Sequence, residues 1–211
     1  MHQQQVAPPH PPPPQPPSWT PPRPARRRRW PFTLALFAVL AVICCCGCPG
    51  YFAKPVVEQY PAEVVLPETI ADFRLRDDSS SRRLVQELEK EIEAGDHFAV
   101  DDTFAAVYGD RLGKRVAVFG TTGLRLTPKS DLEREMTRLT ERYALTELTE
   151  IDSDTRGQHQ QCALGNSQGV TVVVCGWADH GSLGVALFTR RSLPESAALL
   201  PEFRDALIIR G

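Results

Sequence analysis

The sequence predicts an α+β domain with a mainly antiparallel sheet and two or three packed helices outside a membrane. One transmembrane helix and a disordered, proline-rich tail are expected to precede it. Neighbouring strand patterns without helices between them, separate helical patterns and one long apolar run without charge support this prediction. The expected boundaries are 1–29 for the tail, 31–50 for the span, 51–67 for a stalk and 68–211 for the domain.

The apolar run from Trp30 to Ala53 has no charged side chain. About 20 helical residues, rising about 1.5 Å each, cross a hydrocarbon core of roughly 30 Å, and Trp30 is typical of a membrane interface. The sequence GCPG, Gly47 to Gly50, is expected to end the helix. A cleaved signal peptide and a lipoprotein acylated at Cys48 are the alternatives; the long preceding segment and the missing upstream aliphatic residue disfavour them.

The charge of the chain is divided unevenly. Residues 1–50 contain five arginines and no acidic residue, whereas the remainder contains 26 acidic and 19 basic residues and carries −7. Arg26, Arg27, Arg28 and Arg29 directly precede the apolar run. Because positive flanks stay in the cytoplasm, the N-terminus is expected inside and the domain outside the cell membrane. An acidic domain with short basic spots also argues against a nucleic-acid partner.

The N-terminal tail is rich in proline. Residues 1–24 contain eleven of the nineteen prolines and no apolar periodicity, so this segment is expected to stay disordered. Its stretch PPHPPPPQPP suits an aromatic groove on a cytoplasmic partner, although a solvated spacer has the same composition. After the span, Pro55, Pro61 and Pro67 predict an extended stalk.

The domain is expected to begin with a short strand or turn at 69–75. Its second helix has the clearest apolar stripe, formed by Leu132, Met136, Leu139 and Tyr143. The closing helix is expected to start after Ser192 and to be kinked or divided at Pro201. Helices are predicted over 79–95 and 127–143, and strands within 102–123 and near 145–151, 157–164, 170–177 and 183–189.

Residues 175–184, CGWADHGSLG, carry the side chains most often used for chemistry. A catalytic triad is disfavoured because Asp179 and His180 are neighbours, which point to opposite faces of an extended chain. Ser182 also lacks the glycine two residues earlier that a nucleophile elbow requires. The stretch is therefore expected to be a turn between two strands. Trp177 is expected to be half-buried, Asp179 to bond locally and Gly181 to take a positive φ.

Cys162 and Cys175 have two possible uses. With His159 and His180 they have roughly the spacing of a zinc site, but 159 and 162, like 175 and 180, differ by an odd number and would face opposite ways on regular strands. A disulfide is favoured, because pairing centred between residues 168 and 169 places the cysteines opposite each other. Closing a loop of about 14 residues contributes about 3 kcal/mol in the chain-entropy model.

The stretch Cys175 to Gly184, with the proline-rich tail, the arginine-flanked span and the stalk, resembles a group of actinobacterial anchored proteins. They carry a Cys-x-Trp-Ala-Asp signature followed by a glycine-containing strand. The resemblance implies a single-pass membrane protein with an extracytoplasmic domain of uncharacterised activity. It supplies no catalytic residue.

These patterns favour a non-enzymatic envelope protein over an enzyme. The anchor is expected to contact membrane lipid, and the outer domain to bind a small ligand or an envelope protein without a cofactor. An anchored enzyme or a zinc-site domain using His159, Cys162, Cys175 and His180 is the alternative. A third hypothesis is that the tail relays to cytoplasmic partners.

Overall fold

The computed structural model describes residues 30–42, 48–93, 95 and 100–211. The expected tail with Arg26 to Arg29 lies outside these residues, and so does the segment 43–47 of the expected span. The chain divides into two compact units, Met1–Ile43 and Cys44–Gly211.

The described part of the first unit is the helix α1 (Trp30–Val42), which has thirteen residues. Its sequence, WPFTLALFAVLAV, contains no charged side chain. Among the residues that the structure describes, no helix is both long enough and apolar enough to cross a membrane.

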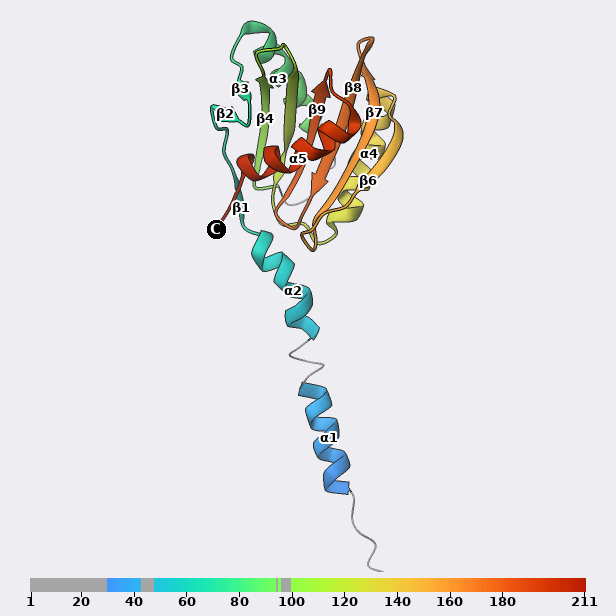
Figure 1. Cartoon of the computed structure of the whole chain (residues 1–211). Coiled ribbons are helices and arrows are strands. Elements are labelled where there is room, and N and C mark those ends of the chain that lie inside the picture. The colour runs from blue at the N-terminus through green and yellow to red at the C-terminus, as the bar shows by residue number, and fades with distance from the viewer. Residues whose placement is uncertain (1–29, 43–47, 94, 96–99) are drawn as a thin grey trace, which may run out of the picture. The chain divides into compact units, whose positions relative to one another are not determined.

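The second unit is built on an eight-stranded antiparallel sheet (Figure 1). The prediction of a mainly antiparallel α+β domain is confirmed. In spatial order the strands are β2 (Thr69–Ile70), β3 (Phe73–Leu75), β4 (Asp102–Gly109), β5 (Arg115–Thr122), β9 (Ser182–Thr189), β8 (Val170–Ala178), β7 (His159–Ser167) and β6 (Thr146–Ile151). The sheet consists of two antiparallel runs, β2 to β5 and β6 to β9, which are joined side by side by the pairing of β5 with β9. The helix α3 (Ser79–Glu93) connects β3 to β4, and α4 (Pro128–Tyr143) leads from β5 to β6 at the far edge of the sheet.

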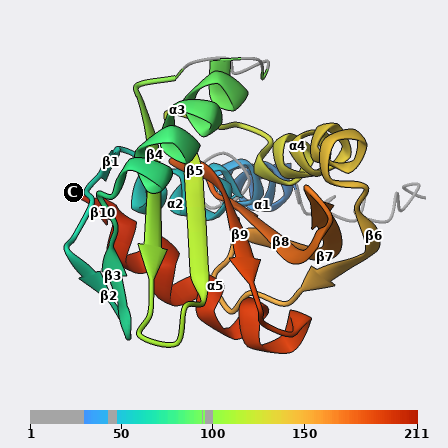
Figure 2. The ribbon, with the colours of Figure 1, turned by 90° about the horizontal axis from the view of Figure 1, so that it is seen from above.

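Helices cover both faces of the sheet (Figure 2). The helices α3 and α4 pack on one face, where the predicted stripe of α4 is buried. The helix α5 (Leu193–Leu207) packs on the other face and continues through Pro201 without a break. There the ring of Phe203 meets Tyr108 and Phe188 edge-on. The two apolar layers hold the central strands rigidly between them.

The expected extended stalk is wrong for most of its length. Residues Cys48–Gln59 form the helix α2, which contains Pro55, so the sequence GCPG does not end a helix at Gly50. After α2, the strand β1 (Ala62–Val64) pairs antiparallel with the closing strand β10 (Ile208–Arg210). Pro55, Gln59 and Ala62 are buried. The segment is part of the domain because burying these side chains and pairing β1 stabilise it more than solvation would.

Candidate functional site

Cys162 and Cys175 form the predicted disulfide. Cys162 lies opposite Cys175 in the register of β7 and β8, with their Cα atoms 4.1 Å apart and an S–S distance of 2.06 Å. The turn between these strands places Gln168 and Gly169 at φ values of 52° and 84°, which suit a tight two-residue hairpin. Both cysteines are wholly buried. The bridge therefore braces two central strands from inside the core.

The disulfide uses both sulfur atoms that the zinc alternative requires. His159 and His180 remain, but two imidazoles do not complete a tetrahedral zinc site. Among the described residues, no group of three or more His, Cys, Asp or Glu side chains is placed to hold a metal ion. The four-ligand arrangement is therefore incompatible with the oxidised domain.

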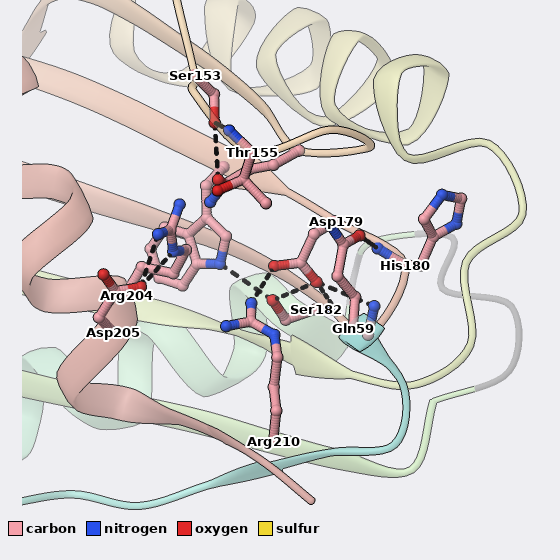
Figure 3. A network of polar contacts seen from close by, with 12 residues as sticks. Gln59, Ser153, Thr155, Asp179, His180, Ser182, Arg204, Asp205 and Arg210 are labelled. Atoms are coloured by element: carbon pink, nitrogen blue, oxygen red, sulfur yellow. Dashed lines mark hydrogen bonds and ion pairs between the residues drawn. The ribbon is translucent and has the colours of Figure 1, made fainter. Parts of the chain in front are cut away.

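Asp179 is the centre of a buried polar network at the turn between β8 and β9 (Figure 3). Its Oδ1 accepts hydrogen bonds from the Gly181 N–H at 2.9 Å, the Ser182 N–H at 2.8 Å and the Ser182 Oγ–H at 3.0 Å. Its Oδ2 lies 2.5 Å from Arg210 Nη2. Ser182 Oγ in turn accepts from Trp177 Nε1 at 3.2 Å. The local bonding predicted for Asp179 is confirmed, and it extends to β10.

This network is not arranged as a catalytic triad. Asp179 and Ser182 are wholly buried and contact each other directly, so no imidazole lies between acid and hydroxyl. The imidazole of His180 is turned away from them (Figure 3), and its Nδ1 donates to the Arg125 carbonyl at 2.7 Å. The arrangement satisfies a buried carboxylate and orients the turn; it leaves no activated nucleophile.

Two predictions for this stretch are wrong. Trp177 is wholly buried, not half-buried, because it points into the layer beneath α5, where Phe104 stacks beside it at 6.3 Å. Gly181 is not among the residues with positive φ. It is required because α2 comes so close that a Cβ there would lie 2.0 Å from the Gln59 carbonyl oxygen. Gly184 serves similarly: a Cβ there would lie 2.2 Å from the Trp177 indole.

The end of α2 is bonded to this turn through Gln59. Its Oε1 accepts from the His180 N–H at 3.0 Å, and its Nε2 donates to the Arg156 carbonyl at 2.8 Å. Gly157 fits between the side chains of His180 and Pro55. A single glutamine therefore links α2 to two loops of the domain, a role that no local pattern in the sequence indicates.

Arg125 is a second residue that the sequence did not reveal. Its guanidinium is 5% exposed, with Nη2 donating to Thr121 Oγ1 at 2.5 Å and Nη1 3.7 Å from Asp131 Oδ2. Burial lowers the pKa of Arg125, while the charges of Asp131 and Asp179 oppose that shift. The cation thus balances carboxylates around the turn.

A polar pocket of about 310 Å³ lies beside this network, along β6, β7 and the loop between them. Lys129 Nζ lies 3.0 Å from Glu150 Oε1, so these two lining charges neutralise each other. Burial and the nearby Lys129 hold the pKa of His159 below its ordinary value. Gln161, also in the lining, has a buried Oε1 without a hydrogen-bond partner. The pocket can accept a small polar group but has no unpaired charge cluster.

The chain was compared with protein-family models and with curated proteins. No protein-family model matches the chain, and no match is found among curated proteins. The resemblance of Cys175 to Gly184 to the actinobacterial group stays a prediction.

Proposed function

We propose that this chain is a single-pass membrane-anchored protein whose extracytoplasmic domain binds a ligand or an envelope partner without catalysing a reaction. The observation that carries the proposal is the internal use of the side chains that suggested chemistry. Cys162 and Cys175 are bridged, and Asp179 and Ser182 are buried and bonded to each other. A domain whose reactive groups serve its own architecture is suited to binding.

Two further features support the location. A disulfide between central strands persists in an oxidising compartment, as expected outside the cytoplasm. The arginines at 26–29 before an apolar run favour a cytoplasmic N-terminus.

The location is tested with the full-length chain in intact cells, carrying a small epitope at each end. Protease added outside is expected to remove the C-terminal epitope and to spare the N-terminal one. Alkylation followed by mass measurement is expected to leave Cys162 and Cys175 unmodified until a reductant is added. A protected C-terminal epitope, or two thiols that react before reduction, would overturn the proposal.

Binding is tested on the full-length chain purified in a non-ionic detergent. A ligand that binds only the folded state increases the free energy of unfolding, by about 2.7 kcal/mol at a hundredfold excess over Kd, and so raises the unfolding midpoint. We expect at least one envelope fraction to raise it. Identical midpoints with every fraction would contradict the binding function.

A further inference from the structure

A second pocket, here called the arginine pocket, lies at the opposite end of the sheet from the β8–β9 turn. It has a volume of about 490 Å³ and is lined by parts of β2, β3 and the turn after β4. Arg74 pairs with Gly109, and Gly109 pairs with Arg115 at the start of β5. The β8–β9 turn lies at the other end of β5, where Thr122 pairs with Ser182. Figure 2 shows the β2–β3 hairpin on the outer side of β4, away from β6. Arg74, Arg76 and Arg111 all line this pocket.

Two of the three guanidinium groups have no polar partner among the residues that the structure describes. Within the described residues, the side chains of Arg74 and Arg111 have no hydrogen bond and no ion pair. Arg76 has one ion pair, between its Nε and Asp78 Oδ2 at 3.4 Å. Like charges gathered at one concave surface repel one another, and an anion between them relieves that repulsion.

Arg76 is also held in place by the backbone beneath it. Its aliphatic stem crosses Gly109, where a Cβ would lie 3.3 Å from Arg76 Cδ. The ion pair with Asp78 engages Nε and leaves the terminal nitrogens for another group. A guanidinium fixed in this way loses little conformational entropy when it binds a phosphate or carboxylate in a bidentate manner.

The lining contains three arginines against two aspartates, Asp72 and Asp110, and Asp78 offsets part of the charge of Arg76. Asp78 and Asp110 also accept hydrogen bonds within their own segments. Asp78 accepts from the Ser80 and Ser81 hydroxyls and from the Ser81 N–H, and these bonds hold its pKa far below its ordinary value. Asp110 Oδ1 accepts from the Leu112 and Lys114 N–H groups, both at 2.8 Å. Asp72 is the remaining carboxylate of the lining, and it is exposed.

We propose that the arginine pocket binds a multivalent anion through Arg74, Arg76 and Arg111. The ligand carries clustered phosphate or carboxylate groups, each of which matches the planar donor fork of a guanidinium. This inference rests on the proposed binding function and names the class of its ligand. Arg191 adds positive charge nearby, since its guanidinium lies 5.0 Å from the centre of the Phe73 ring, and Phe73 is in the lining.

The test uses the full-length chain in a non-ionic detergent, with inorganic pyrophosphate and citrate as probes in isothermal titration calorimetry. We expect saturable binding of one probe molecule per chain. The double variant Arg74→Gln/Arg111→Gln is expected to bind at least roughly tenfold more weakly, because two charge-assisted contacts are lost. Arg134→Gln, which removes an exposed arginine on α4, serves as the control and is expected to bind normally. The preferred probe distinguishes a phosphate ligand from a carboxylate ligand.

A second variant keeps the inference testable if the double variant does not fold. Asp72→Asn removes the exposed carboxylate from the lining and is expected to tighten binding by roughly threefold. No binding at concentrations on the order of 10 mM, or equal affinities in the wild type and the folded arginine variant, would overturn the inference. Weaker binding in Asp72→Asn would overturn it as well. These outcomes are independent of the epitope experiment, which tests the location of the domain.

Discussion

The two ends of the sheet treat their charges in opposite ways. At the hairpin end, around the β8–β9 turn, Asp179 receives three hydrogen bonds on one oxygen and an ion pair on the other, all within the protein. At the arginine end, the side chains of Arg74 and Arg111 have no such contact among the described residues. The comparison teaches that residue types common in active sites have a structural role where their hydrogen bonds and ion pairs are all made within the protein. Charged groups without partners in the protein can form new charge-assisted hydrogen bonds with a ligand, which stabilise its binding.

Burial explains the difference. A carboxylate removed from water costs several kcal/mol unless donors replace the solvent, so the hairpin end had to be completed by the fold itself. Exposed arginines keep their hydration and do not destabilise the domain when they are unpaired. Exposed arginines can therefore remain unpaired in the folded domain and be available to bind a ligand.

The largest expected effect is that of Gly184→Ala at the hairpin end. The new methyl group would overlap the wholly buried Trp177 indole, so the ring must move, and we expect a loss of about 4 kcal/mol in the free energy of unfolding. Chemical denaturation measures it. Gly169→Ala is the control, with open space but a φ of 84°, and should cost about 1 kcal/mol. Equal losses for the two variants would mean that the indole contact does not decide the packing.

Asp179→Asn tests whether the buried network stabilises the hairpin end. Loss of the charge leaves the Arg210 guanidinium without its counter-ion, and we expect the free energy of unfolding to fall by about 3 kcal/mol. The matched control is Asp77→Asn, whose side chain is 83% exposed in its ion pair with the exposed Arg82 and should cost at most about 1 kcal/mol. If both variants lost the same stability, the contrast between buried and exposed carboxylates would not hold.

The pH dependence of stability should differ between the two ends. The pKa of His159, near the hairpin end, is lowered in the folded state, so the unfolded chain binds its proton first. Its contribution to stability is therefore lost as the pH falls below about 6.5. His159→Gln is expected to flatten unfolding curves between about pH 7 and 5.

Glu195, near the arginine end, provides the control for this pH experiment. Hydrogen bonds from Ser192 lower its pKa, so its contribution is present above the unfolded value and is lost as the pH falls through the folded value. Glu195→Gln should change stability at neutral pH but leave the slope between about pH 7 and 5 intact. A His159→Gln variant with an unchanged slope would show that another group titrates there.

The smallest effect on stability is expected at the arginine end. Arg74→Gln/Arg111→Gln removes two exposed side chains without internal partners, so the free energy of unfolding should stay within about 0.5 kcal/mol of the wild type. Denaturation curves of the two proteins check this. A large loss would assign these arginines to the architecture and remove the contrast with the hairpin end.

Local patterns in the sequence determined most of the sheet and the bridge. The alternating apolar residues, the turn after Asn166 and the distance of thirteen residues between the cysteines were enough to place Cys162 opposite Cys175. The apolar stripe of α4 from Leu132 to Tyr143 could also be predicted, because residues three or four apart lie on the same face of a helix. Such signals depend on near neighbours in the chain, which the sequence states directly.

Tertiary structure alone decided which groups complete the site. His180 is bonded to Gln59, 121 residues away, and Asp179 to Arg210, 31 residues away. The helical conformation of α2 and the need for Gly181 also follow from this packing, since the prolines after the span suggested an extended stalk. The physical reason is that a buried donor or acceptor must be satisfied by whatever the folded chain brings near it. The distance between two residues along the sequence does not indicate whether the fold brings them into contact.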